Sequence, residues 1–418
     1  MTTDATLSEA VAKPDHIPAE LVYDFDMYRD PALLADPHQR VLDLHQQAAP
    51  IFWTPRNGGH WVLLGHQANF EAARDVESFS NEIYPREQME EIFAALEKDM
   101  GRIPLAVPIN LDPPDHTKFR QPLQRVFSPK TIEGLRGSIR DLARELIGKF
   151  AGRGRCEVMN EVAEPLPVQV FLKMLGLPLE RLAEYRKLTR EHLAAIGSDN
   201  PMDSLTSMQD VAAAMRETIL ERKENPRDDI ISLLWKVEID GRPITLEDQE
   251  NYGVLLFIAG LDTVMQGIGH GVRHLARDQA LQSTLRANPA LIKDATEELL
   301  RRYTFTVPPR RVARDMVFQG VEMKKDERAV MFLPGADLDG REFENPEQYN
   351  LERTRPHIAF NAGPHRCLGS HLARVELQVL YEELLAALPQ FRLDPEHPPT
   401  FHGGNVIGVE TLNLVWEV

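Results

Sequence analysis

One segment near the middle of the chain, residues 245–277, limits the possible folds more than any other. It reads TLEDQENYGVLLFIAGLDTVMQGIGHGVRHLAR, and its first residue is a threonine with an acid, Asp248, three positions later, which is typical of a helix N-terminus. A helix over these 33 residues would be about 50 Å long and would cross a whole domain. Because residues 254–259 are apolar on every side, we expect a helix buried all round within a mainly α-helical fold.

Polar residues interrupt this buried stretch. Asp262 and Thr263 follow it directly, and Gly260 stands just before them. A carboxylate inside such a helix is costly unless it is paired or hydrated, and a threonine hydroxyl can bond to the carbonyl of Ala259 and loosen the helix. The pattern predicts a dent in the helix with an acid and a hydroxyl beside it. The alternative is a polar turn that faces solvent.

The composition of the 418-residue chain excludes several classes of protein. A net charge of −17 argues against a general nucleic-acid binder, because phosphate contacts need a basic surface. The two cysteines, Cys156 and Cys367, are too few for a disulfide framework or for an iron–sulfur cluster, which takes about four. The first twenty residues lack the apolar core of a signal peptide or a membrane anchor. We therefore expect a cytoplasmic protein that does not contact a membrane.

The chain shows no internal repeat and no low-complexity linker, so residues 21–418 are predicted to form one domain after a loose arm at 1–20. Two β-rich runs around Asn57-Gly58-Gly59 predict a hairpin within 51–65. A helix at 86–102, on a long irregular segment, is either a pocket lid or an ordinary surface helix. Further helices are predicted at 115–127, 131–151, 161–175, 179–195, 203–224, 228–236 and 289–303, with strands near 316–333 and 401–416.

The second cysteine lies in the sequence FNAGPHRCLG, residues 360–369. Gly363 and Pro364 predict a tight turn, Gly369 permits a close backbone approach, and an amphipathic helix follows. Cys367 would then lie at a helix N-terminus, where free amide donors and the helix dipole favour a thiolate. Such a thiolate is a nucleophile or a soft metal ligand, although a lone cysteine is more often an inert buried residue.

A single thiolate can be the only protein ligand of a haem iron, whereas zinc and iron–sulfur sites need several ligands. As a nucleophile it would need a base, for which His365 is a candidate. No C-x-x-C-H motif is present, so a haem would be bound non-covalently and would need cationic partners for its two propionates. The candidates are His116 and Arg120, which are four apart on one helix face, together with Arg310 and His365.

Together these residues resemble the motifs of the cytochrome P450 family, in particular its soluble bacterial members. The likeness runs from about residue 16 to the end of the chain and is nearest to the camphor-hydroxylating monooxygenase group. By this resemblance the fold is a triangular, mainly α-helical prism with a small β-rich region. The matching motifs are the haem-binding loop Phe360-x-x-Gly363-x-His365-x-Cys367-x-Gly369, the oxygen-activation motif Ala259-Gly260-x-Asp262-Thr263, and Glu298-x-x-Arg301.

The resemblance implies haem b with Cys367 as its axial ligand, and a monooxygenase that inserts one atom of O2 into a C–H bond. Asp262 would pass protons inward and Thr263 would hold a water at the oxygen site. Arg353 would join the Glu298–Arg301 pair in bracing the side of the haem that carries the cysteine. The other residues assigned to haem binding are His116, Arg120, Arg310, His365, Phe360, Gly363, Gly369, Ala259 and Gly260.

The two electrons would come from a separate ferredoxin of the 2Fe–2S type with its own reductase, because this chain has no room for a flavin domain and no cysteines for a cluster. The ferredoxin would dock on a basic face. The residues predicted for that face are Lys118, Arg120, Arg355, Arg366 and Arg374.

Camphor itself is not the expected substrate. The camphor enzyme should carry a tyrosine that bonds the ketone, and Pro104 stands near that position here, with Tyr84 a weaker substitute. A terpenoid, a norisoprenoid such as an ionone-like ketone, or a small aromatic compound would fit an apolar lining. The residues predicted to line the pocket, besides the loop at 84–109, are Leu255, Ile258, Thr306, Asn405 and Val406.

Three other functions remain to be weighed. The same fold can act without a reductase as a peroxygenase or an isomerase, but the intact pair of Asp262 and Thr263 favours the monooxygenase. A haem sensor or carrier would not need that pair in a buried groove. A cysteine hydrolase without haem is the least favoured interpretation.

Overall fold

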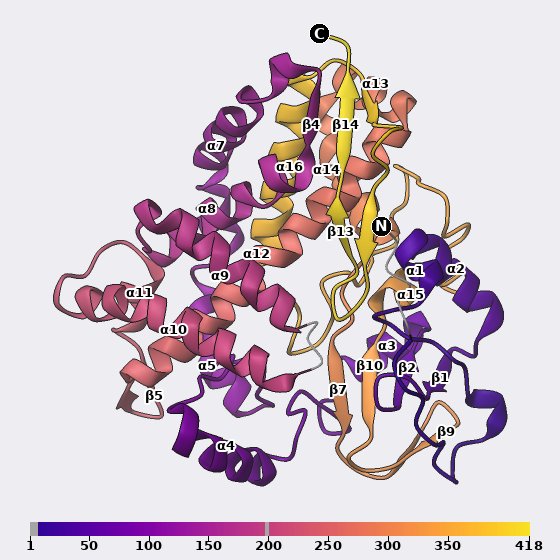
Figure 1. The fold of residues 1–418 in the computed structure, drawn as a ribbon, viewed down its shortest axis with the longest axis vertical. Coiled ribbons are helices and arrows are strands. Elements are labelled where there is room, and N and C mark those ends of the chain that lie inside the picture. Colours follow the sequence, from indigo (N-terminus) through magenta and orange to yellow (C-terminus); the bar gives the residue numbers. More distant parts are fainter. Residues whose placement is uncertain (1–6, 197–199) are drawn as a thin grey trace.

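The computed structural model describes residues 7–196 and 200–418, in which helices surround the central helix α12 (Leu246–Arg277) and a strand-rich region lies beside them (Figure 1). The predicted fold class, mainly α-helical with small sheets, is confirmed.

The other α-helices are α1 Pro31–Ala35, α2 Pro37–Gln47, α3 His66–Ala72, α4 Arg86–Met100, α5 Asp115–Gln124, α6 Pro129–Glu133, α7 Arg136–Gly148, α8 Pro165–Leu175, α9 Leu182–Ile196, α10 Pro201–Glu224, α11 Ile230–Leu234, α13 Gln279–Ala287, α14 Ile292–Arg302, α15 Leu333–Asp337 and α16 Ser370–Ala387. The strands are β1 Ile51–Thr54, β2 His60–Leu63, β3 Phe79–Ser80, β4 Arg155–Glu157, β5 Glu238–Ile239, β6 Arg242–Pro243, β7 Pro309–Val312, β8 Met316–Phe318, β9 Val321–Met323, β10 Arg328–Met331, β11 Phe391–Leu393, β12 Thr400–His402, β13 Gly408–Thr411 and β14 Asn413–Trp416.

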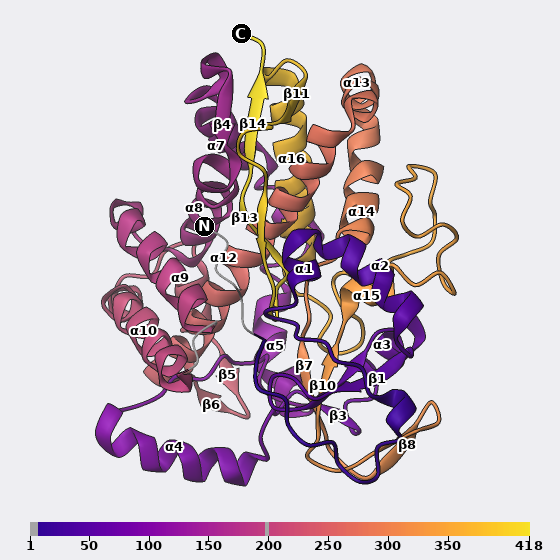
Figure 2. The same cartoon turned by 45° about the vertical axis from the view of Figure 1, so that its right-hand side comes forward.

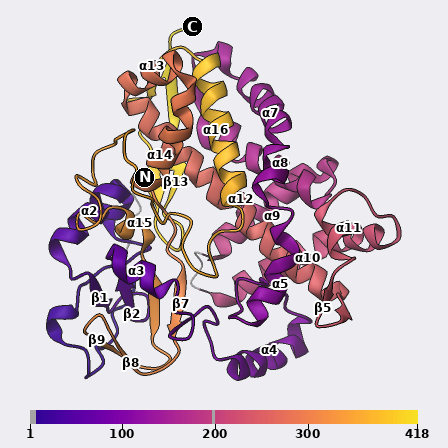
Figure 3. The same cartoon turned by 180° about the vertical axis from the view of Figure 1, so that it is seen from behind.

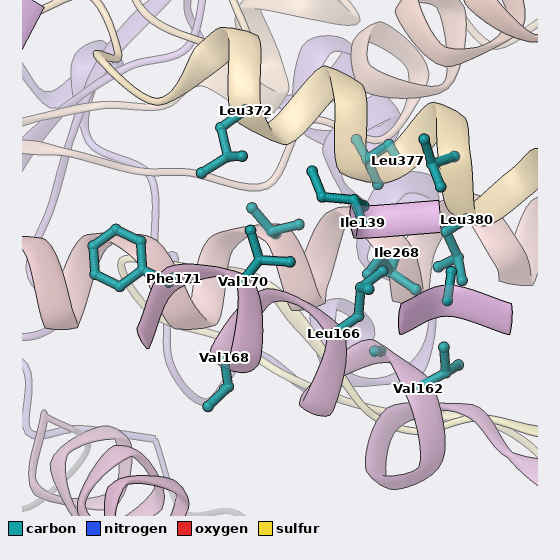
Figure 4. Packing of buried hydrophobic residues seen from close by; sticks show 14 of the residues in the cluster. Ile139, Val162, Leu166, Val168, Val170, Phe171, Ile268, Leu372, Leu377 and Leu380 are labelled. Atoms are coloured by element: carbon teal, nitrogen blue, oxygen red, sulfur yellow. The ribbon is translucent and has the colours of Figure 1, made fainter. Parts of the chain in front are cut away.

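Helix α12 begins where the sequence predicts. The backbone amide of Asp248 donates to the hydroxyl of Thr245, and the amide of Thr245 donates to the carboxylate of Asp248 at 2.7 Å, so two free amides at the helix start are satisfied together. Helices α8, α10 and α16 pack against α12, and seen from behind, α16 lies beside α12 and α14 (Figure 3). In the core between them, side chains such as Leu166, Ile268 and Leu377 meet (Figure 4). The expected burial of α12 therefore holds except on one face, which borders a cavity.

Helix α12 is also the one helix, within the part of the chain that the structure describes, that is long and apolar enough to cross a membrane. The core helix of a soluble protein passes the same test of length and composition. Of its most apolar window, 65% is buried inside the protein, so here its apolar side chains serve the core.

The predicted hairpin is confirmed and belongs to the largest sheet. Strands β1 and β2 pair antiparallel, with Phe52 opposite Val62, and the turn residues Asn57 and Gly58 have φ of 53° and 80°. The strand order is β1-β2-β10-β7-β3, in which β10 runs parallel to β2 and the other pairs are antiparallel. The sheet therefore brings β3, at residues 79–80, beside β7, more than two hundred residues later.

Two of the predicted helices differ in detail from those observed. The segment 131–151 forms two helices, α6 and α7, since the chain turns at Gly134 where α6 ends. The segment 161–175 begins with a π-helical turn, Met159–Ala163, before α8 starts at a proline. Proline is favoured in the first turn of a helix because it has no amide hydrogen to leave unpaired.

The described part of the N-terminal arm, residues 7–20, is fixed rather than loose. The amide of Ser8 donates to Asp26 Oδ2 at 2.7 Å, and Ile17 is only 1% exposed. At the other end of the chain, β14 pairs with β4, so that Leu414 lies opposite Cys156. We propose on this ground that residues 21–418 form one domain, to which the arm is attached.

Helix α4 lies along the bottom of the molecule, away from the helices around α12 (Figure 2). It has no buried residue. The chain just after it is tied to α12, because Arg102 Nη1 donates to Glu250 Oε2 at 2.8 Å and the amide of Leu105 donates to Asn251 Oδ1 at 2.9 Å. Of the two alternatives for this helix, its placement favours a surface helix whose following loop, rather than the helix itself, reaches the cavity.

Candidate functional site

A cavity of about 380 Å³ lies between α12, the cysteine loop, α5 and β7. Most of its wall is apolar. The structure brings twelve of the predicted site residues to this wall, from four separate parts of the chain. They are His116, Arg120, Leu255, Ala259, Gly260, Thr263, Thr306, Arg310, Phe360, His365, Cys367 and Gly369.

Several predicted residues lie elsewhere, for reasons that the helix geometry explains. On α12, Leu255, Ala259 and Thr263 form one row of residues four apart that faces the cavity. Ile258 and Asp262 belong to the neighbouring row, so Ile258 packs against the core and does not line the cavity.

Three further residues predicted to contact substrate do not reach the cavity wall. Tyr84 is 49% exposed and precedes Pro85, from which α4 leads away from the cavity. Asn405 and Val406 lie beside Thr306 and Val307 through backbone pairing and are not among the residues that line the cavity. The carbonyl of Asn405 accepts from the amide of Val307 at 2.7 Å, and Val406 forms an isolated β-bridge with Thr306.

The cysteine loop is held by its own backbone and by a close contact with α3. The amide of Cys367 donates to the carbonyl of Phe360 at 2.8 Å, which closes the loop. Gly363 has φ of 65°, and a Cβ at this position would lie 2.2 Å from the carbonyl oxygen of Ala73. Only glycine fits there, because it alone combines the left-handed conformation with the absence of a side chain. Gly363 therefore shapes the loop from behind and does not line the cavity.

The accessible surface of Cys367 faces the cavity, and the rest of the residue is enclosed by protein. Burial raises the pKa of its thiol above the ordinary value, while the amide of Gly369 and the charges of Arg120 and Arg374 lower it. Burial thus disfavours the thiolate, whereas the neighbouring amide and the two arginines stabilise it. A cation bound at the sulfur would tip that balance toward the thiolate.

Two histidines and two arginines stand around the cysteine. The rings of His116 and His365 lie 4.0 Å apart, and each has a buried nitrogen, Nδ1 and Nε2 respectively, without a partner among the described residues. Burial, followed by the neighbouring positive charges, lowers the pKa of His116 to about 4 and that of His365 to about 2. These shifts favour the neutral imidazoles, each of which offers a ring nitrogen for a hydrogen bond. The positive charge comes from Arg120, which donates to the carbonyl of Arg366, and from Arg310.

The surface of α12 is recessed at Gly260, where a side chain is missing, and the ring of Phe171 fills part of that recess. The hydroxyl of Thr263 donates to the carbonyl of Ala259 at 3.1 Å and borders the cavity. A Cβ on Gly260 would lie 2.8 Å from the ring of Phe171, so the missing side chain makes room for α8. The polar turn facing solvent is ruled out for Asp262, which is only 6% exposed.

Asp262 is held by a neighbour on the same helix. The amide of Gln266 donates to its carboxylate at 3.1 Å, while the carbonyl oxygen of the same Gln266 side chain accepts from the backbone amide of Val409 at 2.7 Å. Burial raises the pKa of Asp262, and the hydrogen bond from Gln266 and the nearby His402 lower it in part. A carboxyl whose pKa is raised in this way keeps its proton at a higher pH than an ordinary aspartate does.

Glu298, Arg301 and Arg353 meet on the side of the cysteine loop. Arg301 donates to both carboxylate oxygens of Glu298, at 2.8 and 2.9 Å, and Arg353 Nε donates to Oε1 at 3.2 Å. Arg301 also donates to the carbonyl of Asp337 at 2.8 Å, and the carboxylate of Asp337 accepts from the amide of Ile358, just before the cysteine loop. Arg301 is 1% exposed and Glu298 5%, so this pair is buried, unlike most ion pairs at this spacing.

Other lining residues carry no signal in the sequence. Phe171 and Phe305 are ordinary core residues by pattern, and Asn81 follows a two-residue strand. They reach the cavity through the tertiary arrangement alone.

Comparisons with known proteins agree with this geometry. The family model described as cytochrome P450 matches residues 201–416. A curated relative, the probable cytochrome P450 127A1 of Sinorhizobium fredii, is 33% identical over 417 residues, which cover 96% of each chain, and a steroid C26-monooxygenase of Rhodococcus jostii is 30% identical over 91% of this chain and 81% of its own. Among solved structures, CYP101J2 superposes with a TM-score of 0.86 at 35% identity, over 98% of this chain and all of that one, and CYP101C1 with a TM-score of 0.86 at 29% identity, over 97% of this chain and all of that one.

The fold has helices around a long central helix, and one apolar cavity holds a cysteine thiol together with histidine and arginine side chains. This combination is typical of haem-thiolate oxidoreductases. The chain belongs to the cytochrome P450 family, whose members are monooxygenases that hold haem b non-covalently through a cysteine thiolate. The residues present fit that group. Of the two cysteines, Cys367 lines the cavity whereas Cys156 is buried in β4, and the unpartnered nitrogens of His116 and His365 face the same space as the arginines.

Proposed function

We propose that this monooxygenase hydroxylates a small apolar compound, a terpenoid or an ionone-like ketone, with two electrons from a separate ferredoxin. The observation that carries the proposal is the cavity. The cavity has to accommodate haem and substrate together, and its lining is mostly apolar. Leu255, Phe305 and Ile109 are among its apolar residues, and Thr306 and Asn110 are the proposed polar anchors for a ketone.

In this proposal the haem supplies the oxidising chemistry, and the protein binds, orients and moves protons. Cys367 would hold the haem iron through its thiolate, and His116, Arg120, Arg310 and His365 would bind the propionates. Thr263 positions a water at the oxygen site through the lone pairs that its hydroxyl keeps while donating to Ala259. Asp262 exchanges protons with solvent from behind Thr263, which its raised pKa supports.

A ferredoxin of the 2Fe–2S type is the proposed electron donor, and the surface beside the cysteine loop is its proposed docking site. The positive charges there differ in availability. Arg374 pairs with Glu297, Arg355 with Glu342, and Lys118 with Asp115 and Asp240, whereas Arg366 is exposed and has no acidic partner among the described residues. Arg366 is therefore the residue from which we expect the largest single contribution to docking. A cytoplasmic location is part of the same proposal.

A spectral screen tests the substrate class. Apolar terpenoid ketones of about ten to thirteen carbons should displace water from the ferric iron and shift the haem absorption, with dissociation constants of about 1–100 μM, because burying apolar surface contributes about 25 cal/mol per Å². Long fatty acids and steroids, which are larger than these ketones, should give no shift. Turnover of the best binder with ferredoxin, reductase and NADH, compared with peroxide alone, then separates a monooxygenase from a peroxygenase. Tight binding of steroids and none of small ketones would contradict the proposed substrate class.

Replacing Thr263 with alanine is expected to uncouple the reaction. The variant should bind haem and consume NADH, but the yield of hydroxylated product per NADH should fall by about tenfold, because the hydroxyl that holds the water is lost. The measurement is product, hydrogen peroxide and NADH in the same reaction. Thr263→Ser, which keeps the hydroxyl, is the matched control and should stay within about twofold of the parent. Equal coupling in all three proteins would remove Thr263 from the mechanism.

A further inference from the structure

One polar residue in the cavity wall has no role in the site described so far. Asn81 directly follows β3 and is only 6% exposed. Its amide nitrogen Nδ2 has no hydrogen-bond partner among the described residues, although a buried amide that lacks a partner destabilises a fold. The residue lines the cavity, so an acceptor within that space is the simplest partner.

The pairing of β3 with β7 ends one residue before Asn81. Phe79 pairs with Val312 and Ser80 with Arg311, and continuing this register by one residue brings Asn81 toward Arg310. Residues directly opposite in an antiparallel pair project to the same face of the sheet. Both Asn81 and Arg310 indeed line the cavity.

The pair before them in the register points the other way. Ser80 donates to the carboxylate of Asp112 at 2.5 Å, and Arg311 pairs with Asp326 at 2.9 Å; neither Ser80 nor Arg311 lines the cavity. The same Asp112 carboxylate accepts the backbone amide of Asn81 at 2.9 Å. The backbone at Asn81 is therefore fixed from behind, which leaves its side chain directed to the cavity face.

The surroundings of Arg310 indicate which kind of acceptor would bind in this part of the cavity. It is 4% exposed, and within the described residues its one hydrogen bond runs from Nη1 to the carbonyl of Pro309 at 2.7 Å. A buried guanidinium needs an anion, and a carboxylate can accept from it and from a neighbouring amide at once. A neutral apolar substrate could satisfy the amide of Asn81 but not the charge of Arg310.

We infer that Asn81 donates a hydrogen bond from Nδ2 to the haem propionate that Arg310 binds, and so belongs to the cofactor-binding residues. The inference rests on the proposed propionate role of Arg310. In this arrangement the amide comes from the residue that follows β3, and the positive charge comes from β7.

Release of haem from the purified holoprotein to apomyoglobin tests this assignment without using activity. Asn81→Asp keeps the shape but replaces the donor by a carboxylate, so haem release should accelerate by about tenfold or more, equivalent to about 1.4 kcal/mol. Asn81→Ala, which only removes the donor, should accelerate release by about threefold. Ser80→Ala is the matched control, because it removes a hydrogen bond of the same strand on the opposite face, and it should release haem at the rate of the parent.

Three results would overturn the inference. Haem release at the parent rate in both Asn81 variants would show that the amide does not bind the cofactor. Equal acceleration in Ser80→Ala would show that the strand had merely loosened. Unchanged haem release combined with weaker binding of ketones than of matched hydrocarbons would assign Asn81 to the substrate. None of these readouts depends on the ferredoxin or on product formation, so failure here is distinguishable from failure of the proposed reaction.

Discussion

Replacing Cys367 with alanine is expected to abolish monooxygenase activity and the strongly red-shifted absorption band of the reduced carbon monoxide complex that thiolate ligation produces. Activity should fall by at least about a hundredfold, since even residues that only support a metal ligand contribute ten- to a hundredfold. The measurement is the difference spectrum of the reduced protein with and without carbon monoxide, together with product formation. The reason is structural: the sulfur of Cys367 faces the cavity among groups that stabilise its anion.

Cys156→Ala is the matched control for this experiment. Cys156 is buried in β4, and burial raises the pKa of its thiol far above the ordinary value, so it stays protonated and serves packing. This variant should keep the carbon monoxide band and lose only about 1 kcal/mol of stability. Retention of the band in Cys367→Ala, or its loss in Cys156→Ala, would contradict the assignment of the axial ligand.

The largest loss of stability is expected from Arg301→Leu. The change leaves the buried carboxylate of Glu298 without its bidentate partner and also frees the carbonyls of Asp337 and Pro346, to which Arg301 donates. Breaking a buried ion pair by removing one partner costs about 3–5 kcal/mol, a large part of the roughly 5–15 kcal/mol that stabilises a typical domain. Denaturant unfolding of the holoprotein, followed by circular dichroism and by the haem band, measures the difference.

An exposed ion pair provides the comparison. Lys149 and Glu145 are four apart on α7 and both are well exposed, so Lys149→Gln should change the unfolding free energy by less than about 0.5 kcal/mol. Arg301→Leu should also release haem more readily than Lys149→Gln does, because Asp337 connects Arg301 to the chain that enters the cysteine loop. Similar unfolding free energies of the two variants would show that the Glu298–Arg301 pair contributes no more to stability than a surface ion pair does.

Features that depend on short stretches of sequence could be predicted. The capping pair Thr245 and Asp248, the glycine turn of the first hairpin and the cysteine loop each carry their signal within a few residues. The order of the cysteine loop, the Ala259–Thr263 motif and the Glu298–Arg301 pair then identified the family, and with it the fold. The prediction that Ile258 lines the cavity was wrong. Each step along α12 rotates the side chain by about 100°, so Ile258 lies in the row of Asp262 and not in the row that faces the cavity.

Features that depend on distant pairing could not be predicted. The strand β7 pairs with β3 and β10 only through the folded sheet, and α2, whose Val41 and Leu44 are buried, packs against parts of the chain far away in sequence. The same limitation hid Asn81. No local pattern marks it, and its meaning appears only once the register brings it toward Arg310.

Helix α4 stands apart from the rest of the molecule in one respect that bears on how such enzymes diversify. Because it buries no side chain, its residues can be exchanged with little penalty to folding, while the loop that follows it, with Pro108 and Ile109, forms part of the cavity wall. Substitutions in that loop would change the cavity wall, whereas substitutions on α4 itself would leave both the wall and the buried core unchanged. Directed libraries that seek new selectivity should therefore vary Pro108 and Ile109, with exposed positions of α4 as the neutral comparison.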